Sequence, residues 1–143
     1  MATPDIAQML SRIDLFAGLS GRQLRQLTSR AKEVHHDPGQ SVTSEGNLAL
    51  GFHLIVDGEA LVTQGGAEPR RLGPGDHFGE ISMIDGQRRS ATVTAETPLR
   101  TITVSHATFG ELLDQDPGFA RTLLTVLCAR LREAEGREAA ASA

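Results

Sequence analysis

The residues best suited to chemistry lie in one short stretch, 78–93, which reads FGEISMIDGQRRSATV. Gly79 allows the backbone to approach a ligand closely, and the carboxylate of Glu80 follows at once. Further along, Arg89 and Ser90 offer a guanidinium and a hydroxyl, which suit a phosphate when free backbone N–H groups accompany them. A carboxylate suits a sugar hydroxyl rather than a phosphate. The stretch therefore predicts a binding site for a sugar phosphate.

The order of residues in this stretch has a further meaning. Residues 81–84 form a short apolar run that predicts a brief helix, whose first N–H groups favour an anion. Phe-Gly-Glu, an apolar turn, a short loop and Arg-small-Ala-Thr-Val together resemble the phosphate-binding cassette of the cyclic nucleotide-binding domain family. Two positions depart from that family's usual pattern. Arg88 stands where many members have proline, and Ser82 stands where many have alanine.

The resemblance implies a role for each part of the ligand site. Glu80 would bind the ribose 2′-hydroxyl and Arg89 would pair with the cyclic phosphate, while other cassette residues would offer backbone N–H groups. Val62 and Leu72 would lie beside the base, and Leu131 would cover it. The expected ligand-binding residues are Phe78, Gly79, Glu80, Ile81, Ser82, Arg89, Ser90, Ala91, Val62, Leu72 and Leu131.

Base selectivity is the least specified property of the expected site. Some family members cap the base with an aromatic ring, and others use hydroxyls late in the last helix. Here Arg130 and Glu135 are the polar residues nearby, and both are expected to be solvated. Ser90 is then the remaining polar residue whose hydroxyl could hydrogen-bond to the base. The Arg-Ser-Ala sequence resembles cAMP binders more than cGMP binders.

Composition limits the alternatives. A length of 143 residues suits one domain, and a formal net charge of -4 argues against a nucleic-acid surface, which would need a basic face. The N-terminus lacks the basic region of a secretory signal, and no apolar run reaches membrane-spanning length. The single cysteine, Cys128, lies in an apolar run, so we expect it to be buried in a helix of a cytoplasmic protein.

The first third of the chain is predicted to be helical, and the middle is predicted to be β-structure. Residues 5–13 carry apolar side chains at helical spacing, and Ser20 is the expected N-cap of a helix that runs to about Ala31. From residue 33 to 105, glycine-rich turns separate short strand-like runs, which is typical of a small antiparallel barrel or jelly roll. Asp57-Gly58 lies between two such runs and predicts a hairpin. The strand-like runs are 41–43, 52–56, 60–63, 92–94 and 99–104.

The last third returns to helix. A first helix is predicted from 106 to about 115, and Asp116 is expected to cap a second, long one. Gly136 is expected to end this helix and leave a frayed tail. The long helix carries an apolar stripe of about two heptads, which fits packing on the barrel and the seam of a homodimer equally well. The stripe consists of Ala120, Leu124, Leu127, Leu131 and Ala134.

The chain has five histidines, which are common metal ligands. His35 and His36 are adjacent, so on a strand they would face opposite sides. His77 follows Pro74-Gly75 and lies near Glu80, which is a faint similarity to metal-binding cupin enzymes. Those enzymes generally have a His-x-His pair among their metal ligands. The sequence contains no such pair and no recognisable nucleophile–base motif, so neither a metal site nor catalysis is expected.

The resemblance extends over about residues 9–135 and implies an α+β fold. This fold is an eight-stranded antiparallel β-roll, or jelly roll, flanked by N-terminal helices and two C-terminal helices. We expect one cyclic nucleotide-binding domain over residues 1–143. Its parts are the N-terminal helices (1–32), the β-roll (33–105) with the cassette (78–93), the hinge and lid helices (106–136) and the tail (137–143).

The implied function is reversible binding of cAMP or cGMP, with cAMP favoured, by a regulatory module that acts on an unknown effector protein. The resemblance implies that Met83 shifts against the first C-terminal helix near Phe109 and Leu112, and that the last helix swings over the base. No cofactor, direct nucleic-acid contact or membrane contact is expected. The alternatives are a non-binding domain of the same fold used for oligomerisation or docking, and the sensor part of a transcription regulator that acts through another chain.

Overall fold

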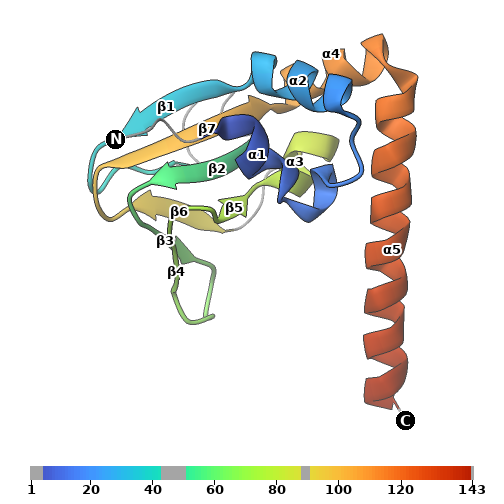
Figure 1. Ribbon diagram of the computed structural model, residues 1–143. Coiled ribbons are helices and arrows are strands. Elements are labelled where there is room, and N and C mark those ends of the chain that lie inside the picture. Colours follow the sequence, from blue (N-terminus) through green and yellow to red (C-terminus); the bar gives the residue numbers. More distant parts are fainter. Residues whose placement is uncertain (1–4, 43–50, 88–90, 143) are drawn as a thin grey trace.

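The computed structural model describes residues 5–42, 51–87 and 91–142. Two antiparallel sheets form a β-roll, with short helices gathered at one end and one long helix standing beside it (Figure 1). The predicted α+β fold with an antiparallel β-roll is therefore confirmed. Seven strands lie within the described residues, and Ser41 adds an isolated bridge to Thr94.

The N-terminal helices begin where the sequence provides caps. Helix α1 (Ile6–Ser11) starts after Asp5, whose Oδ1 accepts a hydrogen bond from the backbone N–H of Gln8. A 3-10 turn, η1 (Asp14–Phe16), leads to α2 (Gly21–Arg30). At the start of α2, Ser20 and Gln23 form a reciprocal capping box, in which each side chain accepts from the other residue's backbone N–H. The predicted N-cap at Ser20 is confirmed.

Each sheet draws its strands from distant parts of the chain. The larger sheet has the order β1-β7-β2-β5, and the smaller has the order β4-β3-β6. All pairs are antiparallel. The strands are β1 (Lys32–His36), β2 (Gly51–Asp57), β3 (Ala60–Thr63), β4 (Arg70–Leu72), β5 (His77–Phe78), β6 (Thr92–Ala95) and β7 (Leu99–Ser105).

The hairpin predicted at Asp57-Gly58 is wrong. β2 pairs with β7 and β5, whereas β3 pairs with β4 and β6, so the two strands belong to different sheets. Gly58 has φ +94°, and a side chain there would collide with the backbone of Pro98. The turn carries the chain from one sheet to the other, because both edges of β2 already have partners.

Two apolar clusters hold the fold together. The larger one joins the big sheet to the helices and includes Phe52, Met83, Phe109 and Phe119, all at most 1% exposed. The smaller one lies between the two sheets and is built around Ile55 and its neighbours from both sheets. The larger cluster ties the short helix after β5 to the C-terminal helices, so these elements cannot move independently without disturbing the core.

The two C-terminal helices are α4 (His106–Gln115) and α5 (Pro117–Ser142). The N-cap predicted for α5 is confirmed, because Oδ1 of Asp116 accepts a hydrogen bond from the N–H of Gly118 at 3.0 Å. The predicted end at Gly136 is wrong. A glycine inside a helix costs only about 1 kcal/mol relative to alanine, and the Ala, Glu and Arg residues that follow are strong helix formers.

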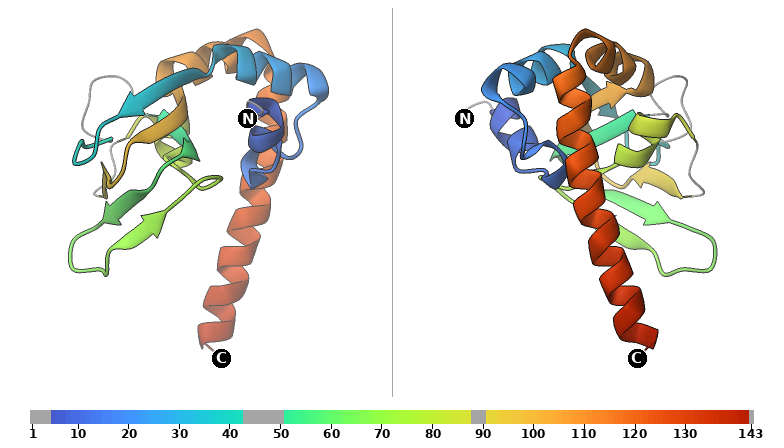
Figure 2. Two further views of the ribbon diagram at one scale, coloured as in Figure 1. Left: turned by 60° about the vertical axis from the view of Figure 1, so that its left-hand side comes forward. Right: turned by 90° about the vertical axis from the view of Figure 1, so that its right-hand side faces the viewer.

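Helix α5 packs on the body through its N-terminal part, as far as Arg130. Figure 2 shows the N-terminal helices beside this part, while the rest extends beyond the roll. Phe119 and Leu123 are buried, but Leu124 and Leu131 are each 62% exposed. Cys128 is exposed as well, so its predicted burial is wrong: it lies on the outward face of the helix. No described helix combines the length and apolarity needed to cross a membrane.

Candidate functional site

Helix α3 (Glu80–Asp85) places the candidate carboxylate at the start of a short helix directly after β5. Gly79 supplies the turn with φ +84°, and a Cβ at this position would collide with the carbonyl oxygen of Gly51 in β2. A glycine is therefore required at residue 79 by the packing of the cassette on the sheet, as well as by its backbone angle. This turn brings Glu80 back beside His77 of β5.

Both carboxylate oxygens of Glu80 have partners from the protein. Oε2 lies 3.3 Å from Nδ1 of His77, and Oε1 lies 3.5 Å from Nη1 of Arg130 in α5. Only 21% of the Glu80 side chain is exposed. The carboxylate is thus fixed from two sides, by its own cassette and by the last helix.

The surroundings keep Glu80 ionised. The hydrogen bond from His77 is the main cause that lowers the pKa of this carboxyl, while partial burial acts in the opposite direction. A backbone hydrogen bond and electrostatic interactions with His77 and Arg130 lower the pKa further. An ionised carboxylate can only accept hydrogen bonds, which suits it to a hydroxyl group of a ligand.

Arg130 brings the N-terminal segment into the same cluster. Its Nε lies 3.2 Å from Oδ2 of Asp14 in η1, and only 30% of its side chain is exposed. The prediction that Arg130 is solvated is wrong, because α5 passes close to both η1 and α3. The sequence held no signal for the partners of Arg130, since 116 residues separate it from Asp14.

The rest of α3 connects the cassette to α4. Met83 is fully buried in the same cluster as Phe109 and Leu112 of α4, and its carbonyl oxygen accepts a hydrogen bond from Nδ1 of His106 at 2.8 Å. This places Met83 against the helix that the sequence interpretation expected it to contact. The contact with His106 was not predicted.

The neighbouring cassette residues differ in exposure. Ser82 is 4% exposed, and its hydroxyl donates to the carbonyl of Gln87, which closes the turn after α3. Ile81 points outward and is 47% exposed. Phe78 stacks on His53, with ring centroids 4.8 Å apart.

Two of the expected phosphate contacts, Arg89 and Ser90, lie outside the described residues, as does Arg88. The described chain resumes at Ala91, which is half-buried and directly precedes β6. The described part of the site therefore comprises the carboxylate, the short helix and the sheet that supports them. The roles of Arg89 and Ser90 stay predictions.

The residues expected beside the base occupy two different environments. Leu72 of β4 is 8% exposed and Val62 of β3 is half-buried; both belong to the cluster between the sheets. Leu131 lies on α5, next in sequence to Arg130, and is 62% exposed. The structure thus brings Glu80 and the helix that carries Leu131 together through Arg130.

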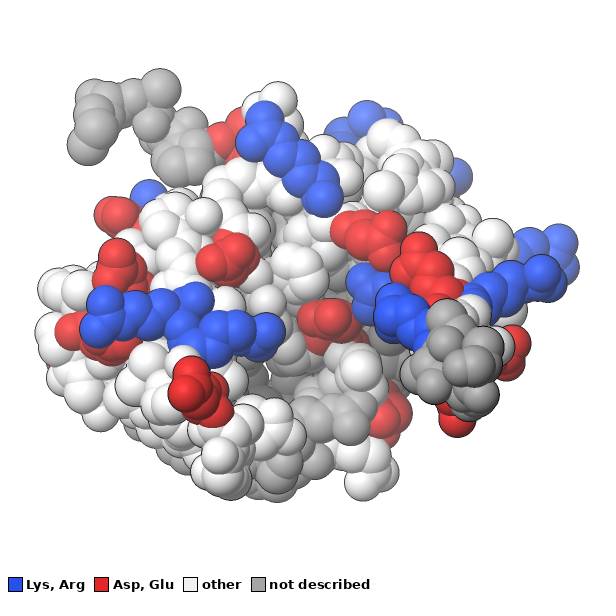
Figure 3. Space-filling view, turned by 90° about the horizontal axis from the view of Figure 1, so that it is seen from below, with Lys and Arg blue, Asp and Glu red and all other residues white. Residues whose placement is uncertain are grey.

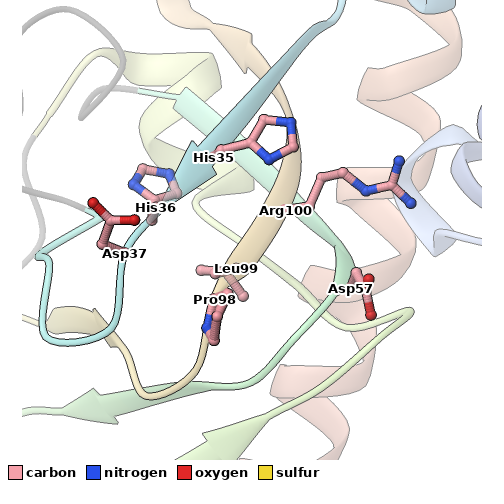
Figure 4. Close-up of a pocket in the computed structure, with 7 residues that line it drawn as sticks. All are labelled: His35, His36, Asp37, Asp57, Pro98, Leu99 and Arg100. Atoms are coloured by element: carbon pink, nitrogen blue, oxygen red, sulfur yellow. The ribbon is translucent and has the colours of Figure 1, made fainter.

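A separate pocket lies where β1 and β2 end and β7 begins. It has a volume of about 380 Å³ (Figure 4). His35 and Arg100, which pair across β1 and β7, both hydrogen-bond to the carboxylate of Glu33. His36 occupies the opposite, buried face of β1. No group of three or more His, Cys, Asp or Glu side chains suited to a metal occurs in the part of the chain that the structure describes. None of the expected nucleotide-binding residues lines this pocket.

Charge on the lower face of the molecule is mixed. Figure 3 shows basic and acidic side chains interspersed there, rather than a continuous basic surface.

The chain is similar to known proteins in sequence. The family model of the cyclic nucleotide-binding domain matches residues 33–116. The chain is 35% identical over 105 residues to a cAMP-dependent protein kinase regulatory subunit of Eremothecium gossypii, an alignment that covers 73% of this chain and 23% of that protein. It is 26% identical over 130 residues to a CRP-like cAMP-activated global transcriptional regulator of Mycobacterium tuberculosis, covering 87% of this chain and 58% of the regulator.

Two solved structures have similar folds. The N-terminal domain of a transcriptional regulator from Streptomyces coelicolor A3(2) superposes with a TM-score of 0.77 at 27% identity, covering 91% of this chain and 94% of that one. The catabolite activator protein of Thermus thermophilus superposes with a TM-score of 0.65 at 27% identity, covering 91% of this chain and 63% of that one. The chain thus spans about a quarter of the kinase subunit and somewhat over half of the mycobacterial regulator.

Proposed function

The chain belongs to the cyclic nucleotide-binding domain family, and we propose that it binds a cyclic nucleotide reversibly, with cAMP favoured over cGMP. The observation that carries this proposal is Glu80, a partly buried carboxylate that is held ionised at the start of α3 and faces α5. In a family whose ligand has a ribose hydroxyl, this carboxylate is the matching acceptor.

The ligand would be held from two sides of its sugar phosphate. Glu80 accepts the ribose 2′-hydroxyl, while Arg89, Ser90 and the backbone of the cassette hold the cyclic phosphate. Val62 and Leu72 support the base from the small sheet. The preference for cAMP rests on the Arg-Ser-Ala sequence of the cassette, which resembles cAMP binders. The relatives do not decide it, because proteins named for cAMP and proteins named for cGMP both occur among them.

The response to ligand would pass through two contacts. Met83 transmits movement of the cassette to α4, because its side chain packs with Phe109 and Leu112. Arg130 transmits it to α5, because its guanidinium contacts Glu80.

The module itself is a non-catalytic sensor, and its effector is a separate protein or another part of a longer chain. An exposed, unpaired Cys128 is compatible with a cytoplasmic setting.

Isothermal titration with cAMP and cGMP tests the proposal directly. We expect saturable binding of cAMP, and much weaker binding to Glu80→Gln, which keeps the shape of the side chain but removes its charge. Absence of heat and of any thermal shift with either nucleotide, at millimolar ligand, would refute ligand binding. The module would then serve oligomerisation or docking.

A second role is favoured by the outer face of α5. Leu124 and Leu131 are exposed seven residues apart, which is the spacing of a coiled-coil seam, and Cys128 lies between them. We propose a homodimer through this face. Sedimentation equilibrium of the native chain and of Leu124→Glu tests it: a dimer that dissociates in the variant supports the seam, and a native monomer refutes it.

A further inference from the structure

We infer that His77 is a positioning residue that determines how strongly the site recognises the ribose 2′-hydroxyl. The inference rests on the proposed function and deepens it. It concerns a residue that the sequence suggested only as a weak candidate for metal binding. In the structure, its Nδ1 instead lies 3.3 Å from Oε2 of Glu80.

The backbone explains why His77 meets Glu80. β5 contributes two residues whose side chains face opposite ways: Phe78 packs with His53, while the ring of His77 lies 5.6 Å from the ring of Phe52. The left-handed turn at Gly79 then returns the chain, so that Glu80 starts α3 beside the imidazole. The ring of His77 is held by Phe52 on one side and is only 28% exposed.

The hydrogen bond between His77 and Glu80 determines which ring nitrogen of His77 carries a proton. Because Glu80 is ionised and can only accept, Nδ1 of His77 must carry the hydrogen and donate it. With Oε2 engaged in this way, Oε1 is the oxygen that remains directed towards α5, where it lies 3.5 Å from Arg130. A ribose hydroxyl would therefore meet a carboxylate that is already oriented, and orientation before binding reduces the entropy lost on binding.

This role predicts a selective defect. Without the donor at residue 77, Glu80 can rotate, and only ligands that use the 2′-hydroxyl lose affinity. His77→Phe removes the donor and keeps an aromatic ring against Phe52. His77→Asn restores a donor at the position of Nδ1. His35→Phe is the matched control, because His35 also pairs with a glutamate, Glu33, but in β1 and away from the cassette.

The experiment measures the affinity of each variant for cAMP and for 2′-deoxy-cAMP by competition titration. We expect His77→Phe to bind cAMP about tenfold more weakly, with 2′-deoxy-cAMP within about twofold of the native value. His77→Asn should recover most of the loss, and His35→Phe should match the native protein. Equal losses for both nucleotides in His77→Phe would show a merely structural role and overturn the inference.

A second test uses the native protein, so its result does not depend on whether the variants fold. Nitrogen NMR of the imidazole reports which ring nitrogen carries the proton. We expect His77 to be protonated at Nδ1 at neutral pH, and a neutral ring protonated only at Nε2 would overturn the inference. If the native chain binds neither cAMP nor cGMP, the proposed function fails, and this NMR result still decides whether His77 orients Glu80.

Discussion

Arg130 in α5 lies with Nη1 3.5 Å from Oε1 of Glu80 and with Nε 3.2 Å from Oδ2 of Asp14. One side chain thus joins three elements that are far apart in the sequence: η1, α3 and α5. The candidate ribose carboxylate is therefore connected directly to the helix that the proposed mechanism moves. Because Arg130 is partly shielded from water, its charge acts on Glu80 more strongly than that of an exposed arginine.

Arg130→Ala should disturb both stability and ligand affinity. Partly exposed ion pairs contribute about 1 kcal/mol or less, so the fold should survive with a small loss of unfolding free energy. Affinity for cAMP should fall about threefold or more, because Glu80 loses one of the two partners that orient it. Urea unfolding and isothermal titration measure the two effects. Arg132→Ala, an exposed position on the same helix, is the control and should change neither.

His106 connects the cassette to α4 through the carbonyl of Met83. Its ring also packs on Gly86, where any side chain would collide with it. His106→Ala should leave cAMP affinity nearly unchanged but reduce the change in amide hydrogen exchange that cAMP causes in α4. His106→Asn, which can still donate to the carbonyl, should restore that response. An unchanged exchange response in the alanine variant would show that Met83 alone couples the two helices.

The pKa of Glu80 predicts a pH dependence of stability. This pKa is lower in the folded protein than the ordinary value of about 4.3 in an unfolded chain. The stabilisation is therefore fully present above the unfolded pKa, and it is lost as the pH falls through the folded pKa. Unfolding by urea should show that native protein exceeds Glu80→Gln in stability at pH 7, with the difference shrinking below about pH 4. A difference that does not vary with pH would contradict the assignment of the shift to this carboxyl.

The sequence predicted those parts of the fold that depend on local patterns. The strands from 52–56, 60–63, 92–94 and 99–104 carry apolar or β-branched runs, and all four are present. β1 was missed because its sequence, KEVHH, is mostly polar and its strand is largely exposed. The hairpin at Asp57-Gly58 was wrong because the pairing of a strand depends on which partners reach its edges, and these come from distant parts of the chain.

In the candidate site, too, the sequence predicted the local features but not the contacts between distant segments. Glu80 and the short helix after Gly79 were predictable, because the cassette is continuous in sequence and its residue order is distinctive. The contacts of Arg130 with Glu80 and Asp14 were not, because they depend on where α5 passes over the body. The hydrogen bond from His77 depends on the left-handed turn at Gly79, which makes neighbours of residues on a strand and on a helix.

Arg89 is predicted to bind the cyclic phosphate, and it lies outside the described residues. A charge-assisted hydrogen bond to a phosphate contributes about 1.5–3 kcal/mol. Arg89→Ala should therefore weaken cAMP binding about tenfold or more, while the fold survives. Arg88→Ala is the matched control and should have little effect. Equal losses in the two variants, measured by titration, would remove Arg89 from its assigned role.

Selectivity between cAMP and cGMP should be modest, because the described part of α5 near the site offers little to read the edge of a base. Arg130 is engaged by Glu80 and Asp14, Leu131 is apolar, and Glu135 is exposed further along the helix. Ser90 is the remaining polar group, and it is also expected to serve the phosphate.

A missing edge contact that water can replace changes the free energy of binding by only about 0.5–1.5 kcal/mol. We therefore expect cAMP to bind more tightly than cGMP, with the two dissociation constants within about thirtyfold of one another. Competition titration of one nucleotide against the other measures the ratio, and Ser90→Ala shows whether the hydroxyl contributes to it. A preference above about a thousandfold corresponds to roughly 4 kcal/mol, which apolar contacts from Val62, Leu72 and Leu131 cannot supply. Such a result would require a specific hydrogen bond to the base.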